Sequence, residues 1–243
     1  MIDPVQFAQN IKNAGFEIFP AATSVETVHE LDCYAQSLRP RRGFDRSQAW
    51  HGWNEVDSLS NPATDIDWAF YWTQHANHPA IDRIKDTIAP YVDAVMGKNN
   101  WLWYLQDFVV LQPHTGMIRP HIDTPYRFSQ FKYEPNHVGL QFMVALCDFT
   151  ESNGATGYVP DTHKYIIDSS HLNNIGWEIF FRDNYRQFTA PVGSIISWHP
   201  RLLHSTMPNR TSEIRRALLL HASENSSFRK LFTVDPNINH KLR

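Results

Sequence analysis

The sequence predicts a mainly β fold of the α+β class, in which an antiparallel sandwich or barrel is flanked by helices. Apolar residues keep helical spacing over much of the first hundred residues, whereas short apolar or alternating runs follow Trp101. No internal repeat or linker sequence divides the chain. We therefore expect a single domain over residues 1–243, with mainly helical support over 1–100, a β core over 101–222 and a tail over 223–243.

The first two elements are predicted from short patterns near the N-terminus. Phe7 and Ile11 share one helical face before Gly15 ends the segment, as glycine often does at the end of a helix. Residues 16–19 then alternate in character, which indicates a short strand.

Two longer helices are predicted after this strand. Thr23 and Glu26 form the capping-box pattern that begins a helix. Pro79 fits the first turn of another helix, which ends at Gly97. The apolar residues with helical spacing are Val25, Val28, Leu31 and Leu38 in the first helix, and Ile81, Ile84, Ile88, Val92 and Val95 in the second.

Residues 39–66, between these helices, are rich in loop-like sequence. Long irregular loops in compact domains tend to be functional or disordered, so this stretch is a candidate lid over a site. The sequence leaves open whether four tryptophans in and after this stretch belong to the core or to a lid: Trp50, Trp53, Trp68 and Trp72.

The predicted strands of the β core share a short length, and turn residues such as Pro113, Asn153-Gly154 and Pro208-Asn209 separate them. These strands cover residues 101–112, 138–147, 155–160, 188–198 and 214–221.

Charge excludes two classes of partner. The formal net charge is −3, and there is no long basic run, so neither a nucleic acid nor a membrane surface is expected as a partner. Arg39, Arg41 and Arg42 form the densest basic cluster, and we expect them to lie in a solvated loop.

Cysteine usage and hydropathy indicate a soluble, cytoplasmic protein. Cys33 and Cys147 are the two cysteines, which fits a reducing compartment and excludes both a disulfide scaffold and a cysteine-ligated zinc site. Residues 1–15 lack the apolar core of a signal peptide, and no apolar run approaches the length that spans a membrane.

Three residues of the predicted β core have the chemistry of a metal site. His121 and Asp123 lie two positions apart in a strand-like stretch, so their side chains point to the same face. This is the only His-x-Asp or His-x-Glu sequence among the thirteen histidines. With His204 as third ligand, two imidazoles and one carboxylate would suit Fe(II) and leave positions open for substrate and oxygen. His199 would face away from His204 in an unbroken strand, but Pro200 can break that register.

The surroundings of these residues resemble the phytanoyl-CoA dioxygenase family of Fe(II)/2-oxoglutarate oxygenases. The resemblance covers roughly residues 105–222 and implies a double-stranded β-helix, the cupin-like jelly roll, with N-terminal helices packed on the sheet. It rests on the spaced motifs at residues 119–123, 149–164, 193–198, 203–205, 208–211 and 215–217.

The resemblance implies a role for six residues. It makes His121, Asp123 and His204 the iron ligands, and it places Arg215 where the family pairs an arginine with the distal carboxylate of 2-oxoglutarate. A guanidinium suits this task because its planar fork matches a carboxylate and stays charged when buried. Thr206 and Gln141 are the further cosubstrate contacts, although Met143 shares the strand face of Gln141 and is an alternative.

Two motifs depart from the family pattern. Residues 160–163 read Pro-Asp-Thr-His in place of Pro-Gly-Ser-His, and Gly193-Ser194 replaces Gly-Asp. Neither contains an expected metal ligand, so the departures concern local turns. The carboxylate of Asp123 disfavours halogenation, because halogenating relatives carry a small residue there.

Several side chains have two readings that the sequence leaves open. Arg119 and Arg127 flank the His-x-Asp motif and either contact the substrate or are solvated, and Tyr104 and Gln106 share a predicted strand face that could reach the site. His163 is expected to be structural, and His114 and His137 are undecided.

The resulting hypothesis is a dioxygenase that uses Fe(II), 2-oxoglutarate and O2 to hydroxylate an unactivated C–H bond of a small molecule, releasing succinate and CO2. A non-catalytic small-molecule-binding jelly roll and a cupin-type metalloenzyme without 2-oxoglutarate are the alternatives. The absence of a basic patch for a CoA phosphate tail favours a small polar metabolite as substrate. The oligomeric state is left open.

Overall fold

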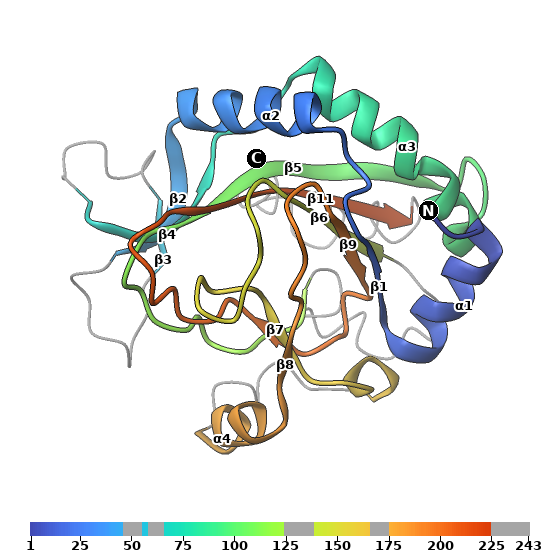
Figure 1. Ribbon diagram of the computed structural model, residues 1–243. Helices are drawn as coiled ribbons and strands as arrows, with labels where there is room; N and C mark the ends of the chain where they lie inside the picture. The colour runs from blue at the N-terminus through green and yellow to red at the C-terminus, as the bar shows by residue number, and fades with distance from the viewer. Residues whose placement is uncertain (46–54, 58–65, 124–138, 166–174, 225–243) are drawn as a thin grey trace.

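The computed structural model in Figure 1 describes five parts of the chain. These are residues 1–45, 55–57, 66–123, 139–165 and 175–224. Trp50, Trp53, Arg127 and His137, about which the sequence left questions open, lie outside these parts.

An eight-stranded antiparallel sheet forms the body of the fold, in the order β1-β9-β6-β11-β5-β4-β2-β3. Its strands are β1 (Phe16–Phe19), β2 (Pro40–Asp45), β3 (Glu55–Asp57), β4 (Trp68–Thr73), β5 (Trp101–Leu111), β6 (Gly139–Ala145), β9 (Ile195–Trp198) and β11 (Arg215–Glu224). A smaller sheet has the order β10-β7-β8 and consists of β10 (His204–Ser205), β7 (Gly157–Tyr158) and β8 (Arg186–Gln187). The two sheets make a jelly roll, which confirms the fold that the resemblance implied. The large sheet is not closed into a barrel.

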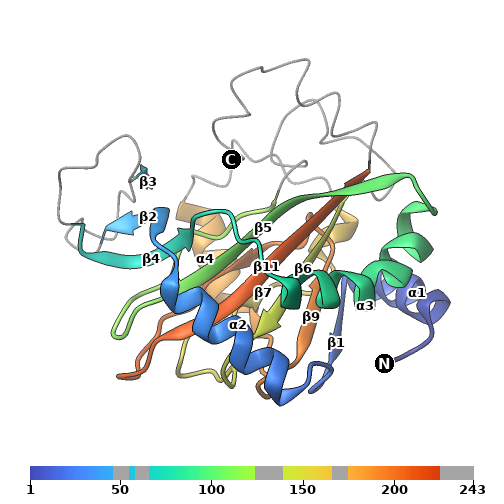
Figure 2. The ribbon, with the colours of Figure 1, turned by 90° about the horizontal axis from the view of Figure 1, so that it is seen from above.

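Helices cover one face of the large sheet, and the other face carries the candidate site. Helices α1 (Pro4–Ala14), α2 (Val25–Ser37) and α3 (Pro79–Met96) lie on one side, and α2 crosses the direction of the long strands (Figure 2). Helix α4 (Ile175–Asn184), which the sequence patterns did not predict, lies on the opposite side, beyond the small sheet (Figure 1).

Side-chain alternation along β11 separates two hydrophobic cores. Leu218 and Leu220 point to the helices and pack with Phe142 and Leu31 in one buried cluster. Leu219, which lies between them, points the other way and packs in a second cluster beneath the candidate site. A one-residue slip would exchange the two faces, so burial on both sides fixes the register of this central strand.

The capping of α1 confirms the prediction, whereas the capping of α2 corrects it. Gly15 ends α1 with a φ of 83°. The cap of α2 is Ser24 and not Thr23: the Ser24 hydroxyl accepts a hydrogen bond from the Thr27 N–H, while the Thr23 N–H donates to Gly193 O. Val25, expected on the apolar face of α2, is 79% exposed, whereas Val28 and Leu31 of the same helix are buried.

Gly15 also fixes the N-terminal segment to the site-bearing half of the chain. A Cβ atom at this position would lie 2.4 Å from Nδ1 of His163, so no larger residue fits without a shift. The Gly15 carbonyl accepts a hydrogen bond of 2.8 Å from the His199 N–H, and His163 Nε2 bonds to the carbonyl of Lys12. His163 is therefore structural, as predicted.

The stretch from 39 to 66 is not entirely irregular. Residues 40–45 form β2, which pairs with β4, and residues 55–57 form β3. The expectation of a solvated arginine cluster is wrong for Arg41, which is 4% exposed and lies 2.6 Å from the carboxylate of Asp107. The local sequence could not indicate the burial of Arg41, because the carboxylate that pairs with it lies far along the chain, in β5.

Within the described ranges, no helix combines the length and apolar character needed to cross a bilayer.

We expect Leu31→Ala to lower the free energy of unfolding by about 2–5 kcal/mol, because Leu31 is fully buried between α2 and the sheet. Val25→Ala, on the exposed side of the same helix, should change it by less than about 0.5 kcal/mol. Urea unfolding of both variants gives the comparison. Equal effects would contradict the packing of α2 described above.

Candidate metal centre

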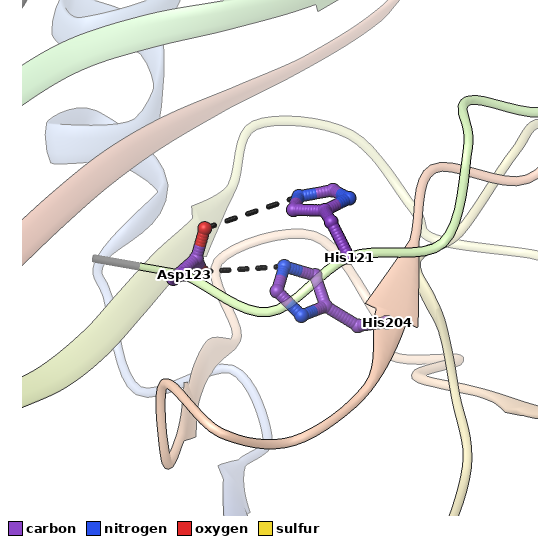
Figure 3. Close-up of side chains that lie close together, drawn as sticks. All are labelled: His121, Asp123 and His204. Carbon is purple, nitrogen blue, oxygen red and sulfur yellow. Dashed lines mark ion pairs between the residues drawn. The ribbon is translucent and has the colours of Figure 1, made fainter. Parts of the chain in front are cut away.

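The candidate metal centre is built where two segments pair through their backbones. His121 and His204 exchange both hydrogen bonds, at 2.9 Å from His121 N to His204 O and 3.0 Å in the reverse direction. The Asp123 N–H donates to Pro200 O at 2.8 Å, which continues the contact. Two stretches far apart in sequence thus present three ligand-type side chains to one point (Figure 3).

The three side chains are close enough to share one ion. Their nearest ligand atoms all lie within 4.8 Å of one another. His204 Nε2 lies 3.2 Å from Asp123 Oδ2, and His121 Nε2 lies 3.9 Å from Asp123 Oδ1. Within the described ranges, this is the cluster of His, Cys, Asp and Glu side chains that could hold a metal ion.

Backbone carbonyls set the orientation of both imidazoles. His204 Nδ1 lies 2.8 Å from Leu202 O, and His121 Nδ1 lies 3.0 Å from Arg119 O. A carbonyl can only accept a hydrogen bond, so each Nδ1 carries a proton, and Nε2 is the nitrogen that can ligate an ion once it is deprotonated. This outer support fixes the tautomer and the ring orientation in metal-binding histidines.

The electrostatics of the cluster favour a charged carboxylate. Burial acts to raise the pKa of Asp123, but the charges of His204, His121 and His221 and a hydrogen bond from His204 outweigh it and lower that pKa below its usual value. Burial also acts to lower the pKa of His204, and the charge and hydrogen bond of Asp123 reverse the effect and raise it. An anionic oxygen held between two imidazoles is the donor set that a divalent cation requires.

Arg215 lies on the same sheet face and is 1% exposed. Its Cζ lies 4.7 Å from the ring centroid of Phe149, and Nη1 lies 3.9 Å from Sδ of Met143. Burial lowers the pKa of its guanidinium to about 10. Arg216 points to the other face and bonds to Asp32 of α2 at 2.6 Å, so the two arginines face opposite sides, as alternation predicted.

Thr206 and Gln141 are both buried. The Thr206 carbonyl accepts a hydrogen bond of 2.9 Å from the Ile118 N–H. Gln141 is fully buried, and both polar atoms of its side-chain amide are without a hydrogen-bond partner in the described structure.

A β-bulge corrects the prediction for Tyr104 and Gln106. The register between β5 and β11 shifts between His221 and Ala222, so alternation breaks at Tyr104. The Tyr104 hydroxyl lies 3.0 Å from His221 Nδ1, whereas Gln106 turns to the helices and contacts Lys85 and the carbonyl of Ala76. The two side chains therefore do not share a face.

The remaining candidate residues take other roles. Arg119 lies 3.6 Å from Glu178 of α4, and His199 Nδ1 accepts a hydrogen bond from the Arg201 N–H rather than joining the cluster. His114 is exposed and has a φ of 53°. Trp72 lies under the guanidinium of Arg42.

Sequence reasoning missed His221 and Trp198. The ring of Trp198 packs 5.5 Å from the ring of His204. His221 is 6% exposed, and burial lowers its pKa to about 4, partly opposed by the charge of Asp123. Strand alternation from Arg215 would have found His221, since the two residues are separated by an even number of positions.

A jelly roll in which two histidines and a carboxylate converge has the architecture of the non-haem Fe(II) oxygenases. The sequence model of the phytanoyl-CoA dioxygenase (PhyH) family matches residues 11–217. The chain belongs to this family of Fe(II)- and 2-oxoglutarate-dependent oxygenases and is an enzyme that uses Fe(II), 2-oxoglutarate and O2.

Solved structures support the same fold at low sequence identity. EctD from S. alaskensis, crystallised with bound Fe, superposes with a TM-score of 0.69 at 16% identity over 93% of this chain and 78% of its own. The epimerase SnoN from nogalamycin biosynthesis gives 0.67 at 17% identity over 91% and 84% of the two chains. HygX from Streptomyces hygroscopicus, solved with nickel, 2-oxoglutarate and hygromycin B, gives 0.66 at 14% identity over 90% and 87%.

We expect Fe(II), or Ni(II) as a stable substitute, to raise the melting temperature of the metal-free protein by roughly 5–10 °C at a hundredfold excess over its Kd. Differential scanning calorimetry measures the shift. His204→Ala should abolish it, whereas His29→Ala, which removes an exposed histidine of α2, should retain it. An unchanged shift in His204→Ala would mean that the metal binds elsewhere.

Proposed function

We propose that this protein is a dioxygenase that hydroxylates an unactivated C–H bond of a small-molecule substrate, with His121, Asp123 and His204 as the iron ligands. The observation that carries the proposal is the convergence of two imidazoles and one carboxylate whose ligand atoms lie within 4.8 Å of one another. The overall reaction consumes 2-oxoglutarate, O2 and R–H and gives succinate, CO2 and R–OH, which balances without a further reductant.

The proposed cosubstrate contact is Arg215, which is buried and has no carboxylate partner among the described residues. A buried charge without a counterion is strongly unfavourable, so an anionic ligand would satisfy it. We propose that the distal carboxylate of 2-oxoglutarate is this ligand and that Thr206 assists. Gln141, one row beyond Met143 on β6, would contact the end of the cosubstrate nearer the metal.

The chain's own residues bind, orient and desolvate. The carbonyls of Leu202 and Arg119 keep both imidazoles in the tautomer that can ligate. Trp198 and the hydrophobic cluster beneath the site limit the access of water. When bound, Fe(II) and 2-oxoglutarate supply the activation of O2 and the two electrons that accompany decarboxylation.

Two observations weigh against the alternatives. A non-catalytic binding jelly roll needs neither the complete set of His121, Asp123 and His204 nor the buried Arg215. A metalloenzyme that does not use 2-oxoglutarate would leave Arg215 buried without an anion. Because one structural neighbour is an epimerase, the oxidative outcome has to be measured and not assumed.

We expect anaerobic addition of Fe(II) and 2-oxoglutarate to the wild-type protein to produce a weak visible charge-transfer band. His204→Ala removes one nitrogen ligand and should eliminate the band. His163→Ala, which removes a structural histidine outside the cluster, should retain it while folded. Absence of the band from well-folded wild type would refute the proposed iron and cosubstrate site.

We expect Arg215→Met to raise the apparent KM for 2-oxoglutarate on the order of a hundredfold, since it removes a buried charge-assisted contact. The matched variant Arg216→Met breaks the bond to Asp32 on the helix side and should leave this KM within about threefold while lowering stability. Succinate formation at varied 2-oxoglutarate concentration provides both values. Equal KM values in the two variants would exclude Arg215 as the carboxylate partner.

We expect a screen of small metabolites to identify compounds that stimulate succinate formation and gain one oxygen atom. Mass spectrometry of the products under ¹⁸O2 distinguishes hydroxylation from epimerisation or desaturation, because only the first adds labelled oxygen. Stimulated succinate formation with products of unchanged mass would overturn hydroxylation and retain the dioxygenase class.

A further inference from the structure

A row of polar side chains crosses the sheet beside the candidate metal centre. In this row Trp198 of β9 pairs with Gln141 of β6, which pairs with His221 of β11. Strands lie about 4.8 Å apart, so His221 lies two strands, or about 10 Å, from Trp198, whose ring packs 5.5 Å from the ring of His204. The charge of Asp123 still acts on His221, so this histidine borders the centre.

Both members of this row that follow Trp198 have unpaired polar atoms. His221 is 6% exposed and Gln141 is fully buried. His221 Nε2 and both polar atoms of the Gln141 amide have no hydrogen-bond partner in the described part of the chain. Buried polar groups are nearly always paired, so these atoms indicate bound ligands that supply the partners: the cosubstrate for Gln141, as proposed above, and a further ligand for His221.

The imidazole of His221 is held in one orientation. The Tyr104 hydroxyl lies 3.0 Å from Nδ1, and the two rings pack edge to face with centroids 5.4 Å apart. The β-bulge in β5 at Tyr104 makes this contact possible, because regular alternation would turn the tyrosine to the helices. With Nδ1 engaged, Nε2 is the atom left for a ligand in either tautomer.

A second unpaired acceptor lies diagonally across the same strand pair. Asp107 pairs with Leu219, and His221 pairs with Leu105, which makes Asp107 and His221 diagonal neighbours about 7–8 Å apart. Asp107 is 1% exposed; its Oδ2 bonds to Arg41, whereas its Oδ1 has no hydrogen-bond partner among the described residues. Nδ1 of His75 lies 3.9 Å from Oδ1, beyond hydrogen-bond distance.

We propose that His221 and Asp107 form the subsite for the primary substrate, and that this substrate is a hydroxyl- or carbonyl-bearing small molecule and not an apolar acyl chain. The inference rests on the proposed function and gives the substrate class of the same site. His221 Nε2 bonds to one polar group of the substrate, and Asp107 Oδ1 accepts a bond from a hydroxyl. An apolar chain would leave both atoms buried and unpaired.

The test is calorimetric binding to Ni(II)-loaded protein saturated with 2-oxoglutarate, which needs no turnover. The probes are matched pairs, each a water-soluble polyol or hydroxy amide and the counterpart that lacks one hydroxyl, together with a medium-chain carboxylate. Wild-type protein, His221→Phe, His221→Gln and Tyr104→Phe are compared. His163→Phe is the matched control, because it removes a buried histidine whose Nε2 bonds to Lys12 O.

In wild type and His163→Phe, we expect at least one hydroxylated probe to bind about tenfold or more tightly than its counterpart. His221→Phe should reduce this preference to within about twofold, and His221→Gln should restore part of it. Tyr104→Phe should give an intermediate preference. The affinity for 2-oxoglutarate should stay within about twofold in each variant.

Three results would overturn the inference. They are a wild type that prefers no hydroxylated probe, a His221→Phe variant that keeps the full preference, and a parallel tenfold loss of 2-oxoglutarate affinity, which would assign His221 to the cosubstrate. Failure of the proposed function is distinct from these. It would appear as Fe(II)-loaded wild type that forms no succinate, whatever the probes bind.

Discussion

The reciprocal backbone pairing of His121 with His204 is the constraint on which the site depends. Two hydrogen bonds of 2.9 and 3.0 Å join a segment after β5 to β10 of the small sheet. The pairing places both imidazoles on one side with ring centroids 4.4 Å apart, before any ion is considered. Asp123 then joins them because its own N–H is bonded to Pro200 O. Ligand geometry is thus a property of main-chain contacts, which change less with sequence than side-chain contacts do.

The side chains on the sheet face beneath the candidate centre change from charged to apolar to polar along the strands. Arg215 lies at one end of β11 and His221 lies toward the other, with Ala217 and Leu219 between them on the same face. The apolar middle holds Met143 and Ile196 from the neighbouring strands. A ligand that crosses this face therefore meets a positive group, a hydrophobic strip and a polar row in succession.

Most elements and the three residues that converge at the candidate metal centre could be predicted from the sequence. Helical spacing located α1 and α3, and strand alternation separated Arg215 from Arg216. Two of the errors arose where a residue's position depends on a distant partner. Arg41 is buried because it forms an ion pair with Asp107. The side chains of Tyr104 and Gln106 point to different faces because β5 has an extra residue opposite β11. Helix α4 was not predicted because its sequence has no strong apolar period. Thr23 and Ser24 are adjacent residues that both carry a hydroxyl group, and the capping pattern pointed to Thr23 although Ser24 caps α2.

Gly15, at the end of the first helix, contacts residues near the candidate metal centre that lie far along the chain. Its carbonyl holds the His199 N–H at the start of the turn that leads to His204, and its missing side chain makes room for His163. The catalytic unit therefore does not begin where the β core begins. An engineered version trimmed to residues 101–222 would lose the contact that supports the turn before one of the candidate metal ligands, so the N-terminal helix belongs in any minimal form of the enzyme.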